Sequence, residues 1–168
     1  MGVILLRVLH VGLGVFWAGT IFFMASYLDP AIRATLPASA VVPQQLMQRK
    51  FMVVLPIIAL ITILSGFALY WRDSGGMTSD WTRSHQGMTL GIGGLAAFIA
   101  FLIGVGVLRP AQMRMMALGP QAQKAEGAEK ERLMNEVAAL RNRATGALRA
   151  VAALIGVAVL CMAVARYA

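Results

Sequence analysis

The sequence predicts an all-α integral membrane protein, a bundle of four transmembrane helices. Hydrophobic residues make up 59% of the 168 positions and charged residues only 13%, a balance outside the range of soluble domains. A helix needs roughly 20 apolar residues to cross about 30 Å of hydrocarbon. Four segments reach that length, at about 3–28, 51–71, 88–108 and 144–165. No other segment is long enough for a soluble domain, so residues 1–168 are expected to form one transmembrane domain.

The first two segments begin differently. Segment 3–28 carries only Arg7 ahead of its apolar core, as a secretory signal peptide would, but the apolar run is too long and no small-residue cleavage site follows it. We therefore expect a retained helix. Segment 51–71 is expected to start early, with the polar residues 44–50 as its first turns, and Pro56 is expected to kink it.

The third and fourth segments are expected to continue beyond the membrane as a cytoplasmic helical hairpin, about residues 110–143. Residues 111–118 are compatible with a helix, and Gly119–Pro120 predict its end. From about residue 121, apolar residues recur at spacings of three and four with charged residues between them. Such a hairpin is either a solvated continuation of two long helices or a surface that holds a partner.

Lysine and arginine predict the orientation of the bundle. Eleven of the fifteen lie in segments 29–50 and 109–149, and the other four lie on the opposite face: Arg7, Arg72, Arg83, Arg166. The positive-inside rule therefore places both termini and the loop 72–87 outside, in the periplasm if the membrane is a bacterial inner membrane. The formal charge of +8 is then mainly a topological signal, which disfavours a nucleic-acid partner.

The chain has two histidines, and both lie in or beside apolar segments. An ionisable ring in hydrocarbon is costly unless something binds it, so such residues are the first functional candidates. His10 lies three residues, about 4.5 Å, beyond Arg7 in the first segment, and His85 lies two residues beyond Arg83 at the start of the third. Both segments run in the same direction, so the two rings are expected at similar depth near the outer face.

Small residues accompany both histidines. His10, Gly14 and Trp17 recur at helical spacing on one face, and His85 is followed at steps of four by Thr89 and Gly93. A glycine-rich face either lets a second helix approach closely or leaves a flat wall for a planar ring. It is also compatible with a homodimer.

Haem b fits this pattern. Two imidazoles on different helices would ligate one iron axially, and the small residues and Trp17 would make room for the macrocycle. Arg7 and Arg83 lie just outside and could pair with the propionates. The alternative for each histidine is a hydrogen bond to a neighbouring helix or to interfacial water. The residues thus favour one haem b held between the first and third helices by His10 and His85.

Copper is the alternative cofactor. The chain has eleven methionines, whose soft thioethers suit Cu(I). Met88 lies three residues from His85, Met77 lies in the outer loop, and a cluster lies at the inner end of the third helix: Met113, Met115, Met116. Methionine is also ordinary apolar filler in membrane helices. The lone Cys161 is expected to be a packing residue.

Other kinds of site are not indicated. No acidic residue lies within the four predicted spans, which disfavours a proton-coupled transporter built on intramembrane carboxylates. The sequence has no phosphate-binding loop, dinucleotide-binding fingerprint or serine elbow. The glycines of residues 91–94 lie inside a predicted span and are expected to serve helix packing.

The first helices resemble a known family. Leu9-His10 is followed by Trp17-Ala18-Gly19 and then by two phenylalanines, Phe22 and Phe23. The second helix has a methionine and a proline in residues 51–56 and a later Gly66. These motifs are similar to those of small four-helix membrane proteins of the HemJ and CopD-like kind, and the resemblance covers roughly helices one to three.

The resemblance implies a haem-related or copper-related function. In HemJ proteins the histidine of the first helix binds haem b and the activity is oxidation of protoporphyrinogen, so His10 would be an axial ligand. The CopD relatives are linked to copper import. HemJ proteins have an essential lysine near the start of helix three, where this chain has Ser-His-Gln-Gly at 84–87. That departure disfavours the protoporphyrinogen oxidase activity and leaves His85 to serve as the second iron ligand.

The first hypothesis is therefore a b-type haem protein of the lipid bilayer that works in electron transfer or haem-dependent oxidoreduction, with a redox partner or membrane complex. A six-coordinate iron would cycle by one electron. Copper transport is the second hypothesis. The third is a cofactor-free structural or partner-binding membrane protein that uses the hairpin 110–143.

Overall fold

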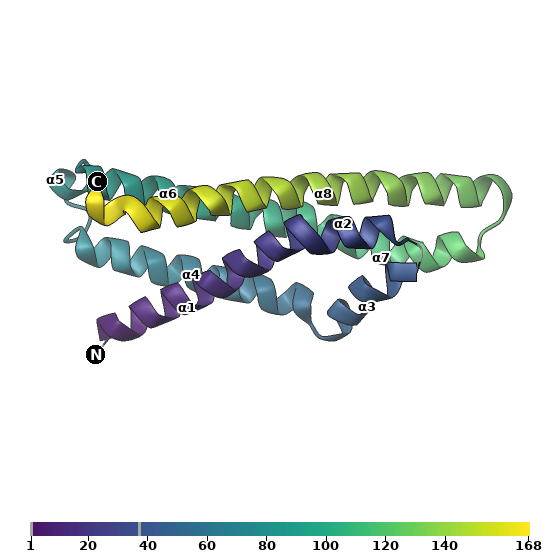
Figure 1. The fold of residues 1–168 in the computed structure, drawn as a ribbon, viewed down its shortest axis with the longest axis horizontal. Helices are drawn as coiled ribbons and strands as arrows, with labels where there is room; N and C mark the ends of the chain where they lie inside the picture. The colour runs from purple at the N-terminus through teal and green to yellow at the C-terminus, as the bar shows by residue number, and fades with distance from the viewer. Residues whose placement is uncertain (1, 37) are drawn as a thin grey trace.

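The computed structural model describes residues 2–36 and 38–168, and every regular element in these residues is helical (Figure 1). Two of the elements are short π-helical segments, η1 and η3, and two are single 3₁₀ turns, η2 and η4. The elements in chain order are α1 Gly2–Phe23, η1 Met24–Leu28, α2 Asp29–Ala34, η2 Ala38–Ala40, α3 Val41–Gln48, α4 Phe51–Asp73, α5 Ser79–Thr82, α6 His85–Ile103, η3 Gly104–Leu108, α7 Arg109–Lys124, α8 Gly127–Val164 and η4 Ala165–Tyr167.

Four stretches of helix in the described residues are long and apolar enough to cross a membrane, in agreement with the four apolar segments identified in the sequence. They are Gly2–Ala34, Phe51–Asp73, His85–Lys124 and Gly127–Tyr167. The first, third and fourth run well beyond the apolar segments of the sequence, because helix continues through the polar residues that follow or precede them. The extended hairpin predicted for residues 110–143 is present as α7 and the first half of α8.

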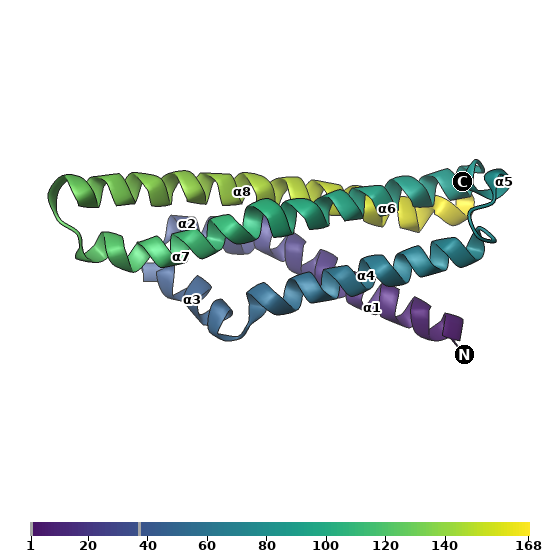
Figure 2. The ribbon, with the colours of Figure 1, turned by 180° about the vertical axis from the view of Figure 1, so that it is seen from behind.

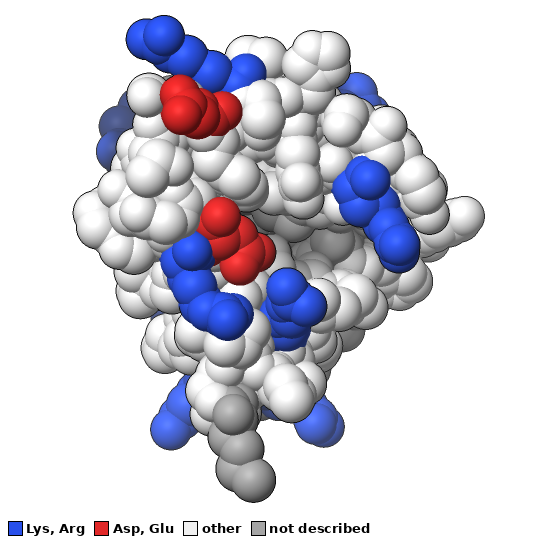
Figure 3. Space-filling model, turned by 90° about the vertical axis from the view of Figure 1, so that its left-hand side faces the viewer, with Lys and Arg blue, Asp and Glu red and all other residues white. Residues whose placement is uncertain are grey.

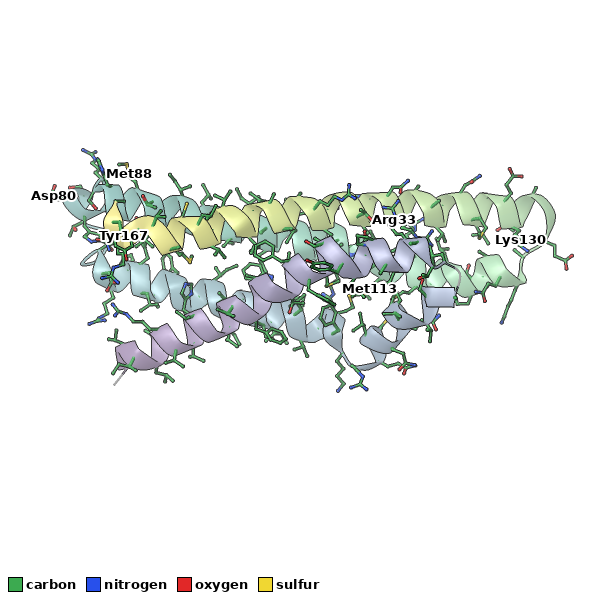
Figure 4. All side chains as sticks on the ribbon, in the orientation of Figure 1. Arg33, Asp80, Met88, Met113, Lys130 and Tyr167 are labelled. Carbon is green, nitrogen blue, oxygen red and sulfur yellow. The ribbon has the colours of Figure 1, made fainter. Side chains whose placement is uncertain are left out.

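The helices pack in two main pairs. α1 crosses α4, while α6 and then α7 run beside α8 (Figures 1 and 2). Both ends of the chain and α5 lie at one end of the bundle, which we call the termini end (Figure 1). The tip of the α7–α8 hairpin lies at the opposite, hairpin end, where Figure 4 places Lys130. Both termini and the loop 72–87 therefore share one end of the bundle, as the predicted topology requires.

Small residues dominate the buried core and large apolar residues face outward. Eleven of the nineteen buried hydrophobic residues are alanines, and the largest buried side chain among the others belongs to Trp17. Large side chains on the outside include Val15, which is 69% exposed, and Leu160, which is 65% exposed. In water such a surface would aggregate, whereas lipid tails solvate it, and small residues let membrane helices approach closely. The exposed side chains therefore support a membrane environment.

Two predicted helix boundaries are wrong. Gly119–Pro120 do not end a helix, because α7 continues through them to Lys124 and the chain turns at residues 125–126. α7 packs along α8 and buries Ala122, and this packing outweighs the weak helix propensity of the two residues. Residues 44–50 do not form the first turns of the second span either. They belong mostly to the separate helix α3, and the left-handed conformation of Lys50 (φ 57°) separates it from α4.

The π-helical segments were not predicted, although one local sequence pattern lies at the end of both of them. Each segment ends in leucine, then a charged residue, proline and alanine, as in Leu28–Ala31 and Leu108–Ala111. The Asp29 N–H donates to the Met24 carbonyl and the Arg109 N–H donates to the Gly104 carbonyl, five residues back instead of four. A proline has no N–H and its ring crowds the carbonyl four residues earlier. A single wide turn accommodates that ring.

Candidate functional site

The His10 ring is fixed on α4 by one hydrogen bond. Its Nδ1 lies 2.8 Å from the backbone oxygen of Thr62, and because a carbonyl can only accept, Nδ1 carries the proton and donates it. The other ring nitrogen, Nε2, then has a free lone pair. Histidines that ligate metals commonly have this arrangement, in which a carbonyl orients the ring and fixes its tautomer.

A glycine makes room for that ring. A Cβ added to Gly66 would lie 2.6 Å from His10 Cε1 and 2.9 Å from Nδ1, so only glycine allows α4 to approach the imidazole this closely. One turn further along α1, a Cβ on Gly14 would lie 3.4 Å from the Thr62 methyl group. Of the two interpretations of the glycine-rich face, close helix packing is thus what the structure shows for Gly14 and Gly66.

The predicted face of α1 points into the bundle. His10 and Gly14 are half-buried, and Trp17 and Ile21 are buried with 5% and 3% of their surface exposed. This face packs mainly on α4, with a smaller contact to α8. Arg7 lies on the same helix closer to the termini end and is exposed.

His85 is the first residue of α6 and is exposed. The preceding Ser84 caps the helix, because its hydroxyl oxygen accepts the Gly87 N–H at 3.1 Å. The carbonyl of His85 accepts the Thr89 hydroxyl at 2.7 Å, so the described hydrogen bonds of this residue use its backbone. Arg83 is also exposed.

Gly87 and Gly93 of α6 serve packing as well, whereas a Cβ on Gly94 would meet no atom within 4 Å. Gly87 lies directly against the Trp81 carbonyl, which leaves no room for a Cβ. A Cβ on Gly93 would lie 2.9 Å from Cys161 Cβ, so Cys161 packs on α6 as predicted. The Tyr70 hydroxyl donates to the Gly87 carbonyl at 3.2 Å, and the Tyr70 ring meets Trp81 edge to face at 5.0 Å.

The two histidines thus lie on helices that start at the same end, His10 inside α1 and His85 at the start of α6, but those helices are not the main packing partners of one another. α1 packs chiefly on α4 and α6 chiefly on α8. Figure 3 looks onto the termini end, where mainly basic side chains surround a central hollow and an acidic side chain lies at its edge. Within residues 2–36 and 38–168, no group of three or more His, Cys, Asp or Glu side chains is arranged to hold a metal ion. A site with two histidines would not form such a group.

The methionines divide between the two ends of the bundle. Met77 and Met88 are exposed at the termini end, at 39% and 48%, and Figure 4 places Met88 near α5. Met115 and Met116 line a cavity toward the hairpin end, and Met113 is 51% exposed.

A polar network between α2 and α8 was missed by the sequence analysis. The buried Thr145 hydroxyl donates to the Asp29 carboxylate at 3.1 Å and accepts from Arg33 at 3.0 Å. The second guanidinium nitrogen of Arg33 donates to the Asn142 side chain at 3.2 Å, and Figure 4 shows Arg33 beside α8. The available signal was the spacing: Asp29 and Arg33 lie one helical turn apart, as Asn142 and Thr145 do.

The chain matches no known family profile, no curated protein and no solved structure.

Proposed function

We propose that the chain is a membrane haem b protein that works in electron transfer or haem-dependent oxidoreduction. The observation that carries this proposal is the orientation of His10. Its Nδ1–H donates to the Thr62 carbonyl, which leaves Nε2 as the only ring atom able to ligate a metal. Because Gly66 closes on the ring from the other helix, the imidazole is held in one position before any cofactor binds.

The second ligand in this proposal is His85. It begins a helix that starts at the same end as α1, and its exposed ring is free of side-chain hydrogen bonds among the described residues. The charged side chains around the hollow of the termini end include both basic and acidic ones (Figure 3), and the basic ones predominate. This excess of positive charge favours an anionic cofactor there. Arg7 and Arg83 are exposed and available to pair with propionates, and Trp17 and Gly14 lie deeper on the His10 face.

The hydrogen bond of His10 suits iron ligation. Donation from Nδ1 to a carbonyl raises the basicity of Nε2 and strengthens a bond to iron. A b-type haem with two imidazole ligands supplies one-electron redox chemistry when bound. In this proposal the protein lies in a bacterial inner membrane with both termini outside, so the haem side faces the periplasm.

An optical spectrum tests the proposal. Protein expressed with ample haem and purified in mild detergent should be red, with a Soret band and a reversible shift on reduction. His10→Ala should abolish the band. His85→Ala should abolish it or convert the spectrum from low spin to high spin, as loss of one of two ligands requires.

Gln86→Ala is the matched control, since Gln86 is an exposed neighbour of His85, and it should keep the wild-type spectrum. Colourless wild-type protein under these conditions would overturn the proposal. If the colourless protein instead copurifies with a partner protein bound through residues 110–143, the partner-binding function is favoured.

Copper transport is the second candidate, favoured by the exposure of three donors at one end. His85, Met88 and Met77 are all exposed at the termini end, where a soft cation could be captured. Uptake of Cu(I) by colourless protein, lost on Met77→Leu or Met88→Leu, would establish this function. Unchanged uptake in both variants would exclude these methionines as its ligands.

A further inference from the structure

Two adjoining cavities lie on the hairpin side of the bundle, away from both histidines. The larger encloses about 220 Å³ between η1, α2, α3, α7 and α8. The smaller, about 60 Å³, lies between α1, α4, α6 and η3. Four residues line both and so mark where they meet: Met24, Met52, Leu108, Gln112. The two form one continuous region rather than separate packing defects.

The lining is amphipathic. Most of it is apolar, including Leu28, Ile32, Met115 and Leu148 in the larger cavity, and Trp17, Ile21, Phe51, Leu55, Ala59, Ala100 and Phe101 in the smaller one. Pockets that bind organic ligands typically combine such walls with a few polar groups.

The charged groups are predominantly cationic. Three arginines, Arg33, Arg109 and Arg141, line the two cavities against one acid, Asp29. Asp29 and Arg33 are already engaged with Thr145. The positive charge that remains lies on Arg109 and Arg141.

Arg109 has an unsatisfied donor. Its Nε is buried and has no hydrogen-bond partner among the described residues, although the residue lines the smaller cavity beside Gln112. A buried guanidinium N–H without an acceptor is costly, and such a group in a native protein commonly indicates an acceptor supplied by a bound molecule.

Both π-helical segments face this region. Met24 and Leu28 of η1 and Gly104, Val105 and Leu108 of η3 line the cavities. A π-helical turn widens the helix and displaces its side chains, and such turns are frequent at functional sites. Here the two wide turns, which precede Pro30 and Pro110, line the same space.

We propose that these cavities bind an anionic amphiphile, a molecule with one acidic oxygen group on a long apolar chain. The acidic group accepts hydrogen bonds from Arg109 and Gln112 where the cavities meet, and the apolar chain lies along the methionine and leucine walls of the larger cavity. A fatty acid carboxylate and an anionic phospholipid share this chemistry. The proposal is independent of the haem proposal, because neither cavity is lined by His10 or His85.

Binding of radiolabelled oleate to the purified full-length protein in neutral detergent tests this inference. Wild type should bind oleate saturably, and methyl oleate and oleyl alcohol, which have no anionic group, should compete at least tenfold more weakly. Arg109→Gln should weaken oleate binding about tenfold or more. Arg49→Gln, at an exposed arginine outside the cavities, should leave it unchanged.

A second pair of variants keeps the test decisive if Arg109→Gln does not fold. Gly104 and Gly106 lie on the same π-helical segment, and a Cβ on either meets no atom within 4 Å. Gly104 lines the smaller cavity and Gly106 lines neither. Gly104→Leu should therefore block binding and Gly106→Leu should not.

Competition between oleate and unlabelled phospholipids distinguishes a free fatty acid from an anionic phospholipid as the ligand. Displacement of oleate by phosphatidylglycerol, but not by phosphatidylcholine, would assign the site to an anionic phospholipid. Resistance to both would assign it to a free carboxylate. Equal affinity for oleate and its methyl ester would overturn the inference, as would unaltered binding by both Arg109→Gln and Gly104→Leu. The optical spectrum of these variants separates this outcome from failure of the haem proposal.

Discussion

The termini end and the hairpin end of the bundle are held together in different ways. At the termini end, helices approach through glycines: Gly66 against His10, Gly87 against Trp81 and Gly93 against Cys161. Toward the hairpin end, α2 and α8 are joined through polar side chains around Thr145, beside a cavity of about 220 Å³. At these three glycines the chain packs too closely for a Cβ atom, whereas the side-chain bridges span a gap between α2 and α8.

This difference indicates which kind of ligand each end of the bundle could bind. Ligands that need one rigid side chain, such as an axial imidazole, suit the closely packed end, because its neighbours fix the ring. A ligand with a long apolar chain suits the cavity, whose walls are mostly apolar. Sequence analysis directs attention to the first end only, since histidine is a rare residue in a membrane span and the residues of the cavity are common ones.

The largest effect is expected from Gly87→Ala. A Cβ there would overlap the Trp81 carbonyl oxygen and approach Thr82 Cα to 3.1 Å, and backbone cannot move aside easily. We expect a loss of about 3 kcal/mol or more in the free energy of unfolding, measured by denaturation in detergent. Gly94→Ala is the control, because its Cβ meets no atom within 4 Å. Equal stability of the two variants would show that close packing does not hold the termini end.

Thr145→Val tests the hairpin side of the comparison. The substitution keeps the shape of the buried side chain but removes the hydroxyl that joins Arg33 to Asp29. Loss of the hydrogen bonds to two charged groups, the half-buried Asp29 and the exposed Arg33, should cost about 1–3 kcal/mol, measured in the same unfolding assay. Thr89→Val is the control, since that hydroxyl bonds only the His85 carbonyl of its own helix. If the network contributes nothing to stability, Thr145→Val and Thr89→Val should have the same free energy of unfolding.

Gly66→Ala separates stability from ligand binding. The new methyl group would lie 2.6 Å from His10 Cε1, and the ring can swing away at the cost of its hydrogen bond to Thr62, about 1 kcal/mol. The Soret band, in contrast, should be lost almost completely. Gly12→Ala, whose Cβ meets nothing within 4 Å, should keep both properties. A full Soret band in Gly66→Ala would mean that the observed ring position is not the one that binds iron.

The smallest effect is expected from Tyr70→Phe. It removes the hydroxyl that donates to the Gly87 carbonyl but keeps the aromatic contact with Trp81. A loss of about 0.5–1 kcal/mol is expected. Tyr27→Phe is the matched control, since Tyr27 is 70% exposed, and it should show no loss. A larger effect in Tyr27→Phe than in Tyr70→Phe would contradict the assignment of this hydrogen bond.

Three features could be predicted from the sequence: the number of long apolar helices, the shared end of the two termini, and the inward face of α1. Hydropathy and helical period act along the chain, so residues such as Trp17 and Ile21 show their burial through spacing alone. The ends of α7 and α3 could not be predicted, because packing of Ala122 along α8 and the left-handed turn at Lys50 outweigh local propensity.

Only the tertiary structure decided which helices pair and what lies between them. All four spans are similarly apolar, so hydrophobicity does not select partners in a membrane. The shapes of the helix surfaces select the partners, through contacts such as Gly14 with Thr62 and Gly93 with Cys161. Those contacts pair α1 with α4 rather than with α6, place His10 against Gly66, and leave the buried Nε of Arg109 beside a cavity. The sequence by itself determined which segments form the four long apolar helices and which face of α1 lies inward, because those properties are local.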